Sequence, residues 1–306
     1  MEIVIPHGIK IGHAENEYTG VTVILSEKGC VAGVDVRGGA PGTRETDLLR
    51  TEKAADKLNA VVLAGGSAYG LAASNGVMEY LKNKNAGFRV GNKVVPLVSS
   101  AVIYDLNSGY YYPDMQMGID ACNNATKIPT FGQVGVGKGA TVGKIRGIKN
   151  ASKSGIGAYT VKCAGLTVTA IVAVNALGDV VDENGEIIAG AKGKDGFINT
   201  EKAILDADVS KILFGTNTTI GCIVTNAKID KNQANKIASI SHNGLARSIR
   251  PVHTDYDGDT IFCMSTGKVP VLNFAILQSA AVVAMENAVR NAVKSGEKYE
   301  VVFEEE

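Results

Sequence analysis

The chain has 306 residues, and its 31 lysines and arginines balance 31 aspartates and glutamates, so the formal net charge is zero. This balance argues against a nucleic-acid partner and against electrostatic attachment to a membrane, because both need a positive surface field. With 45% hydrophobic and 20% charged residues, the chain can bury a large core. No apolar run approaches the ~20 residues of a membrane span, and the first residues lack the basic character of a signal peptide.

Cysteine usage and histidine spacing both argue against a structural metal or a disulfide framework. The five cysteines are odd in number and never form a C-x-x-C pair, which is typical of a reduced, cytoplasmic protein. The four histidines lack metal-ligand spacing, so we interpret His242 and His253 as ordinary, hydrogen-bonded side chains. We therefore expect no metal and no cofactor.

The first 44 residues predict strands joined by glycine turns. Two β-rich runs, at 21–25 and 31–36, are separated by Lys28-Gly29, which predicts a hairpin. A glycine loop follows at 37–44. With 36 glycines in 306 residues, the chain has roughly 12% glycine, against a usual share of ~7%. This excess indicates many tight turns of this kind.

The next segment predicts a helix, a strand and a second helix. Thr46 is a candidate cap for a helix that runs to Leu58. An apolar strand is predicted at 60–64, and Ser67 would begin and cap a helix through Leu81. The serine-nucleophile pattern G-x-S-x-G is off by one residue at this serine, so we favour the cap.

The middle of the chain predicts strands and loops. Residues 95–157 are glycine-rich strand and loop, and residues 166–174 form a buried strand. The charged segment 182–211 lacks periodicity and predicts a long surface loop, a kind of segment that is usually functional or mobile. Buried strands follow at 218–224 and 260–264.

Two helices are predicted near these last strands, one through Ile237 and Leu245 and one over 276–293. No repeat, low-complexity segment or linker divides the chain. The order of elements therefore predicts an α/β (α+β) protein with layered mixed sheets, folded as a single domain over residues 1–306.

Residues 132–139 nearly match the phosphate-binding pattern G-x-x-x-x-G-K-[ST]. The last position is a glycine, so the hydroxyl that would hold magnesium is missing. No clear strand precedes the segment and no clean helix follows it. We favour tight glycine turns at a sheet edge, with a nucleotide-binding loop as the alternative.

The informative junction lies between Asn217 and Thr218, where a charged loop leads into a buried strand. A threonine hydroxyl is a poor nucleophile by itself. If the chain is cut before it, the new α-amine, with a pKa of ~7.7–8.0, can act as the local base. The alternative is an ordinary threonine of good β-propensity at a strand start.

Two aspartates and an asparagine strengthen the first interpretation. Asp257 and Asp259 precede a buried strand and share a face if the segment is extended. If both are buried, such close like charges need a cation, an ammonium group or a hydrogen-bond network. Asn175 ends an apolar strand, where its amide must be paired and could donate to an oxyanion. The alternatives for the aspartates are an acidic turn in solvent and a calcium-like D-x-D loop.

At these residues the chain resembles the L-aminopeptidase/D-esterase family of N-terminal nucleophile hydrolases, which includes β-peptidyl aminopeptidases and nylon-oligomer hydrolases. The resemblance extends over nearly the whole chain. The matching motifs lie at residues 33–43, 63–71, 102–106, 139–144, 173–176, 217–221 and 253–259.

The resemblance implies a precursor that cuts itself between Asn217 and Thr218 into a large piece, residues 1–217, and a small piece, residues 218–306. Thr218 would then be the nucleophile. The positions that match the family's catalytic centre are Thr218, Asn175, Asp257, Asp259, Tyr104 and Lys144. Among them, Asn175 would stabilise the oxyanion.

The resemblance also implies a four-layer αββα sandwich assembled from both pieces, in a homo-oligomer such as a tetramer. The implied activity is hydrolysis of amide and ester bonds in small peptides or peptide-like oligomers. The family's substrates include α-peptides, β-peptides and synthetic amide oligomers, so the natural substrate stays open.

Two other interpretations remain open. Ornithine acetyltransferases also use a self-cleaving threonine, but for acyl transfer, and their Ala-Thr-Met-Leu signature is absent here. An uncleaved homologue with a binding or structural role is the second alternative.

Overall fold

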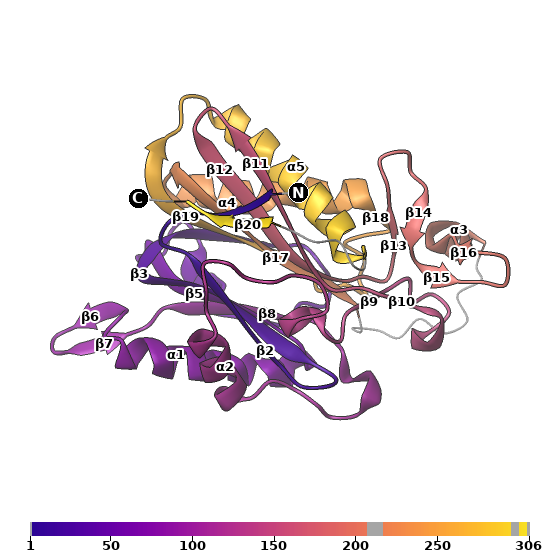
Figure 1. Ribbon diagram of the computed structural model, residues 1–306, viewed down its shortest axis with the longest axis horizontal. Helices are drawn as coiled ribbons and strands as arrows, with labels where there is room; N and C mark the ends of the chain where they lie inside the picture. Colours follow the sequence, from indigo (N-terminus) through magenta and orange to yellow (C-terminus); the bar gives the residue numbers. More distant parts are fainter. Residues whose placement is uncertain (1, 207–216, 295–299, 305–306) are drawn as a thin grey trace.

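The computed structural model describes residues 2–206, 217–294 and 300–304. Its longer α-helices cover the two outer sides of a double β-layer (Figure 1). On one side lie α4 (Lys231–Ser248) and α5 (Phe274–Ala292), and on the other lie α1 (Ala73–Asn83) and α2 (Met115–Asn123). The predicted mixed α/β fold with αββα layers is thereby confirmed.

One nine-stranded sheet supplies both inner layers. Its strands are β2 (Lys10–Glu15), β3 (Gly20–Val36), β4 (Thr43–Arg44), β5 (Lys57–Ala64), β8 (Val98–Val102), β11 (Ile156–Cys163), β12 (Leu166–Asn175), β17 (Thr218–Lys228) and β19 (Thr260–Pro270). They pair in the order β11-β12-β17-β19-β3-β5-β8-β4, with β2 beside β3.

The long strand β3 belongs to both layers. One of its edges pairs with β2 over residues 20–25 and with β19 over residues 31–36. Its pairing with β5 is irregular between Leu25 and Cys30. The sheet therefore folds over near residues 26–30, so that its two halves face each other.

Three apolar cores separate the four layers. Side chains alternate between the two faces of a strand, so β12 directs Val172 and Val174 toward the core under α4 and α5. Ile171 of the same strand enters the central core between the sheet halves. Likewise β5 divides its side chains between the central core and the core over α1 and α2. Because both faces are buried, these strands are continuous apolar runs in the sequence.

The helices near the C-terminus have clear start signals and close packing. α4 begins at a capping box, in which the Asp230 carboxylate accepts from the Gln233 N–H at 2.8 Å and the Gln233 amide oxygen accepts from the Asp230 N–H at 3.0 Å. Asn273 caps α5 in the same sense, at 2.9 Å from the Ala275 N–H. Gly244 lets the two helices approach, because a Cβ there would lie 2.7 Å from the Val282 carbonyl oxygen.

Three local predictions were wrong. The hairpin at Lys28-Gly29 does not form, since β3 continues through Gly29 (φ +70°) to pair with β19. The helix expected after Thr46 is only a 3-10 turn, Asp47–Leu49, because Leu58 is needed in β5. Ser67 does not cap a helix either, because it lies inside a 3-10 turn, Ser67–Ala72, which follows Gly66 and leads into α1.

Two segments contain more structure than predicted. Residues 95–157 include α2, whose N-cap Asp114 accepts from the Met117 N–H at 2.8 Å. Residues 182–206 are not a structureless loop, and the rest of that predicted loop, 207–211, lies outside the described residues. The elements found in 182–206 are β14 (Ile187–Ala189), β15 (Ala191–Lys192), β16 (Phe197–Ile198) and α3 (Thr200–Leu205).

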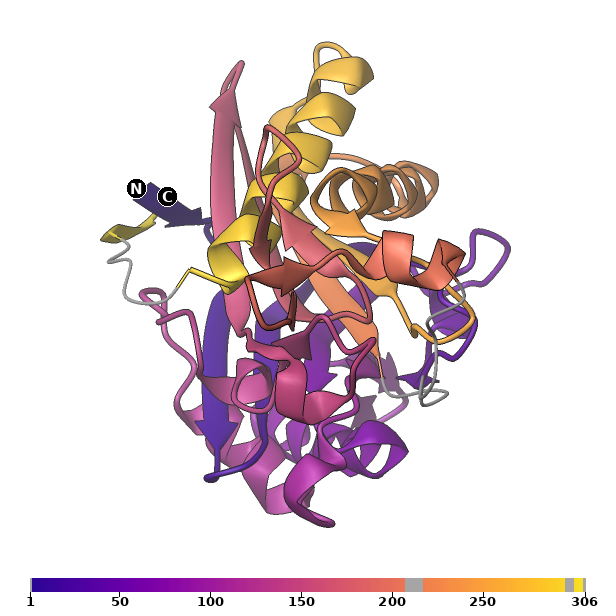
Figure 2. The same cartoon turned by 90° about the vertical axis from the view of Figure 1, so that its right-hand side faces the viewer.

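The remaining strands form small sheets at the periphery. β1 (Glu2–Ile5) and β20 (Glu300–Phe303) pair in parallel and bring the two ends of the chain together (Figure 2). The others are β6 (Phe88–Val90), β7 (Lys93–Val95), β9 (Thr141–Val142), β10 (Ser152–Lys153), β13 (Asp179–Val181) and β18 (Ile249–Arg250). Within the described ranges, no helix is long and apolar enough to cross a membrane.

Candidate active site

Three adjacent strand ends bring the predicted site residues together. Thr218 is the first residue of β17 and is only 4% exposed. Asn175, the last residue of β12, lies opposite Thr218 in the antiparallel ladder. On the other side, β19 pairs in parallel with β17, and Asp259 directly precedes it. Residues that are far apart in the sequence therefore meet at one end of the sheet.

The peptide bond between Asn217 and Thr218 is buried, and two groups contact its carbonyl oxygen. Thr218 Oγ1 contacts the carbonyl oxygen of Asn217, and the Gly258 N–H donates to the same oxygen at 3.0 Å. A Cβ on Gly258 would lie 2.8 Å from Thr218 Oγ1. Only glycine therefore leaves room for the hydroxyl beside this carbonyl group.

The Asn175 amide has a fixed orientation. Its Oδ1 accepts from Lys144 Nζ at 2.7 Å and from the Thr141 N–H at 3.2 Å. Because both partners are donors, the oxygen must face them, and Nδ2 donates to the Tyr104 carbonyl oxygen at 3.0 Å. Tyr104 thus contacts Asn175 through its backbone carbonyl group. The resemblance, in contrast, had matched Tyr104 to the catalytic centre as a tyrosine.

The side chain of Lys144 is buried beside Asn175. Its Nζ also donates to the Asn175 carbonyl oxygen at 2.9 Å. Burial lowers the pKa of Lys144 to about 7, against the attraction of Asp257 and Asp105. Burial also raises the pKa of Asp105 to about 6, although its Oδ1 accepts from the Gly66 N–H at 2.6 Å. Groups with pKa values near neutrality can exchange protons at physiological pH.

Both aspartates of the predicted pair are buried, Asp257 at 1% exposure and Asp259 at 0%. Asp257 accepts from the Thr254 hydroxyl at 2.5 Å and from the Leu177 N–H at 3.3 Å. Asp259 Oδ1 accepts from the Thr219 N–H at 2.6 Å. Burial, and then the nearby Asp259, raise the pKa of Asp257 to about 6. The alternative of an acidic turn in solvent is therefore wrong, and a hydrogen-bond network surrounds the pair.

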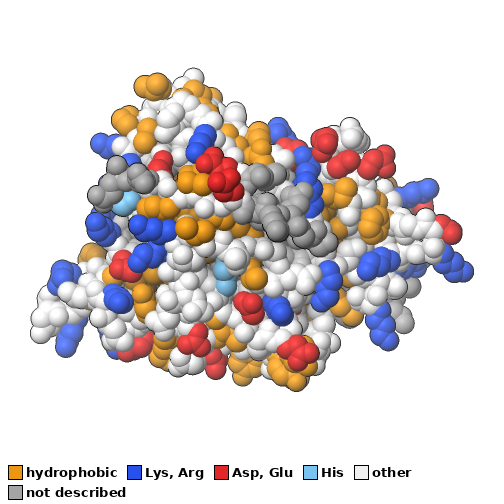
Figure 3. All heavy atoms as spheres, in the orientation of Figure 1, with side chains coloured by type: hydrophobic (Ala, Val, Ile, Leu, Met, Phe, Trp, Pro, Cys, Tyr) orange, Lys and Arg blue, Asp and Glu red, His pale blue; other side chains and the backbone are white. Residues whose placement is uncertain are grey.

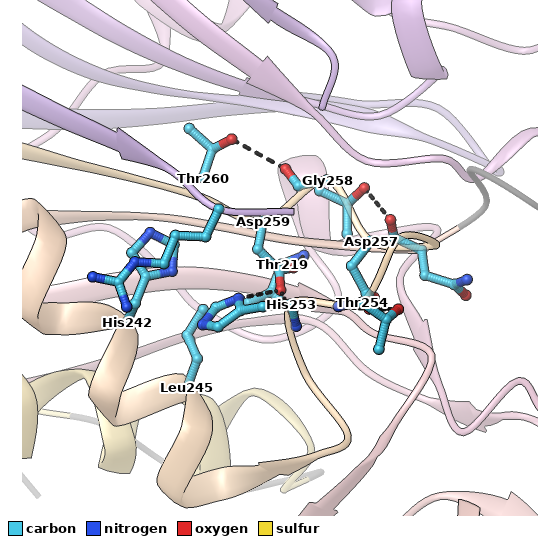
Figure 4. A network of polar contacts seen from close by, with 12 residues as sticks. Thr219, His242, Leu245, His253, Thr254, Asp257, Gly258, Asp259 and Thr260 are labelled. Atoms are coloured by element: carbon cyan, nitrogen blue, oxygen red, sulfur yellow. Dashed lines mark hydrogen bonds and ion pairs between the residues drawn. The ribbon is translucent and has the colours of Figure 1, made fainter. Parts of the chain in front are cut away.

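His253 is the site residue that sequence reasoning missed. Its backbone N–H donates to Asp259 Oδ2 at 3.1 Å, and its Nδ1 lies 2.8 Å from the same oxygen (Figure 4). The sequence interpretation of an ordinary, non-metal histidine is compatible with this contact but gave it no role. The available signal was the short separation of the histidine from the two acids within the motif 253–259.

The metal and nucleotide alternatives find no support in the described part of the chain. It contains no group of three or more His, Cys, Asp or Glu side chains placed to hold a metal ion. In the glycine segment 132–139, a buried 3-10 turn packs Gly137 so tightly that a Cβ would lie 2.3 Å from the Ile156 nitrogen. The segment is a close backbone packing element, as the favoured interpretation expected.

Comparison with known proteins decides the family. Residues 5–304 match the sequence profile of peptidase family S58. The chain belongs to this family. The S58 protein is therefore a hydrolase acting on amide bonds, as the motifs predicted.

Named relatives span most of the S58 chain. An uncharacterised aminopeptidase of Mycobacterium leprae is 40% identical over 265 residues, covering 82% of this chain and 71% of the relative. The 6-aminohexanoate-oligomer endohydrolase of Paenarthrobacter ureafaciens is 34% identical over 274 residues, covering 86% of this chain and 74% of the relative.

Solved structures share the fold of the S58 chain. The L-aminopeptidase D-Ala-esterase/amidase of Ochrobactrum anthropi, described as a variant of the Ntn hydrolase fold, aligns with a TM-score of 0.68 at 20% identity over 93% of this chain and 83% of its own. A β-aminopeptidase of Burkholderia sp. aligns with a TM-score of 0.67 at 22% identity, over 93% and 84%.

Proposed function

We propose that this S58 protein is a self-processing amidohydrolase with an N-terminal threonine nucleophile. It cuts its own chain between Asn217 and Thr218, and Thr218 then attacks amide bonds of small peptides or peptide-like oligomers. The contact of the Thr218 hydroxyl with the Asn217 carbonyl group carries this proposal. The activities in the relatives' names, aminopeptidase and oligomer endohydrolase, support the substrate class.

Self-cleavage begins with attack of Thr218 Oγ on the Asn217 carbonyl carbon. The hydroxyl proton passes to Asp257, whose raised pKa suits a carboxylate that takes and returns a proton near neutrality. The Gly258 N–H, already at 3.0 Å from the carbonyl oxygen, stabilises the oxyanion. The C–N bond then breaks, the proton moves to the Thr218 nitrogen, and an ester remains. Water hydrolyses the ester and leaves a carboxylate on Asn217 and a free amine on Thr218.

The mature enzyme uses the same hydroxyl on a substrate. The Thr218 α-amine, with an ordinary pKa near 8, accepts the hydroxyl proton as Oγ attacks the substrate carbonyl. Asn175 Nδ2 stabilises the oxyanion, a contribution worth ~2.7–4 kcal/mol for one such donor. Lys144 holds the amide oxygen of Asn175 and so fixes where that donor points. The amine product leaves with the proton, and water hydrolyses the acyl-enzyme ester.

A substrate panel tests the activity. Aminoacyl-p-nitroanilides and short amide oligomers are incubated with the wild type and with Thr218→Ala, and products are followed by absorbance and mass spectrometry. The proposal expects hydrolysis by the wild type alone. Transfer of the acyl group to an added amine, without hydrolysis, would favour the acyltransferase alternative. Hydrolysis by both proteins would refute the role of Thr218.

The assembly of the protein and its cytoplasmic location remain predictions. We propose a homo-oligomer, a tetramer, on the resemblance to the family, and size-exclusion chromatography with light scattering measures it. Acidic and basic side chains are interspersed over the face in Figure 3, in agreement with the zero net charge. All five cysteines are free thiols, which supports the proposed cytoplasmic location.

A further inference from the structure

His253 adopts a backbone conformation that brings two of its donors onto one carboxylate oxygen. Its φ of +58° lies in the left-handed region, which is strained for a non-glycine residue and is maintained only where the surroundings impose it. The result is a pair of contacts with Asp259 Oδ2, from the backbone N–H at 3.1 Å and from Nδ1 at 2.8 Å.

Asp259 connects this histidine to the nucleophile. Its other oxygen, Oδ1, accepts from the Thr219 N–H at 2.6 Å, and that N–H belongs to the peptide bond that follows Thr218. The Asp259 side chain is 0% exposed. A buried carboxylate with three donors directed at it is favoured in its charged form.

The charged groups around His253 are compatible with this role. The ring centroid of His242, on α4, lies 4.7 Å from the ring centroid of His253. His242 Nε2 lies 3.1 Å from the Asp35 carbonyl oxygen of β3. Burial lowers the pKa of His242 to about 4, so this ring is neutral. Two further charged groups belong to this surrounding: Asp257 in the same loop, which attracts Lys144, and the Asp35 carboxylate, which is paired with Arg37.

We propose that His253 is a positioning residue that donates from Nδ1 to Asp259, keeps Asp259 ionised, and thereby assigns the exchangeable proton of the aspartate pair to Asp257. Two close carboxylates do not readily carry two charges, so one of them takes a proton near neutrality. Through Thr219, the ionised Asp259 also fixes the peptide group beside the nucleophile. The catalytic consequence rests on the proposed function, whereas the charge assignment can be measured without it.

Two substitutions separate the hydrogen bond from the backbone strain. His253→Asn keeps a side-chain donor near the position of Nδ1, and asparagine tolerates a positive φ. His253→Gly tolerates the same φ and has no side-chain donor. His7→Asn is the control for loss of a histidine, because His7 lies with Thr266 and Lys268 toward the opposite end of β19.

The first measurement is a pH titration of ¹³C-labelled aspartate carboxyl groups by NMR in Thr218→Ala, which needs no turnover. Signals are assigned by their loss in Asp257→Asn and Asp259→Asn. With His253 or Asn at position 253, Asp257 should titrate near 6 while Asp259 stays ionised. In His253→Gly, Asp259 should also take up a proton in this range. An unchanged Asp259 signal in His253→Gly would overturn the charge assignment.

The second measurement is the pH profile of kcat and KM in processed enzyme. We expect His253→Gly to lose about 100-fold in kcat, the order found when a reacting group is displaced by ~1 Å, with KM changed less than about threefold. Its acid limb should move by more than about half a pH unit. His253→Asn should recover kcat to within about tenfold of the wild type. Equal losses in the two variants, at an unmoved limb, would refute the positioning role. If the wild type hydrolyses nothing while the NMR result holds, only the proposed function fails.

Discussion

The space beside the Thr218 hydroxyl makes Gly258→Ala a quantitative test of the self-cleavage geometry. The added Cβ would lie 2.8 Å from Thr218 Oγ1 and 2.7 Å from the Ala40 carbonyl oxygen, whereas ordinary contacts begin at 3.4 Å. The hydroxyl, the loop or both must therefore move by about 0.6–0.7 Å. The same movement shifts the Gly258 N–H, which donates to the Asn217 carbonyl oxygen.

We expect self-cleavage of Gly258→Ala to be about 100-fold slower than in the wild type, since a misplacement of ~1 Å costs an oriented reaction about that factor. Crowding should also lower the free energy of unfolding by ~1–3 kcal/mol. The assay follows the uncut chain by intact-mass spectrometry from the moment of synthesis, and urea denaturation measures stability.

Gly244→Ala is the matched control for crowding. Its Cβ would lie 2.7 Å from the Val282 carbonyl oxygen and 2.8 Å from the Glu286 nitrogen, between α4 and α5. It should lose comparable stability but cleave at the wild-type rate. If Gly258→Ala cleaves as fast as Gly244→Ala, the Gly258 N–H and the Thr218 hydroxyl do not cooperate as proposed.

The remaining predictions concern three other side chains. Asn175→Ala should lower kcat by about 10²–10³-fold, measured with the best p-nitroanilide; an unchanged kcat would remove Asn175 from the oxyanion site. Because the folded-state pKa of Asp105 is raised to about 6, its contribution to stability is lost as pH rises from about 4 through 6. Asp105→Asn should therefore be more stable than the wild type at pH 7. If Asp105→Asn is less stable, the folded protein favours the charged carboxylate and the raised pKa is wrong. The pKa of Lys144 is lowered to about 7, so unfolding free energy should rise between pH 7 and 10, and Lys144→Met should abolish that rise in urea titrations.

The layered fold could be predicted from the sequence because its long apolar runs are unambiguous. Residues 60–64 and 166–174 became β5 and β12, each buried on both faces. The helices through Ile237 and over 276–293 also appear where the 3.6-residue pattern placed them. Such periodic segments are decided by burial, which the sequence encodes directly.

Local turn signals were weaker than tertiary pairing. Lys28-Gly29 has hairpin composition, but the free edge of β3 beyond it is taken up by β19, so the strand continues. The helix predicted from Thr46 to Leu58 failed for a similar reason, because residues from Lys57 onward pair with β3 and β8. A propensity of a few tenths of a kcal/mol does not compete with a ladder of buried hydrogen bonds.

The site was partly predictable, because its residues lie at strand ends that the sequence already marked. Thr218, Asn175 and the two aspartates each border an apolar strand, and adjacent strands place them at one end of the sheet. The role of His253 was not predictable, since its contact with Asp259 depends on a left-handed backbone conformation that the sequence does not reveal.

Self-cleavage by Thr218 is tested most simply by the intact mass of the purified wild type beside that of Thr218→Ala. We predict two wild-type species whose masses add to the full chain plus one water and whose boundary falls between Asn217 and Thr218. Thr218→Ala should give one species of full length. A single full-length wild-type species that still hydrolyses amides, or a cut Thr218→Ala, would show that the activity does not depend on self-cleavage by Thr218.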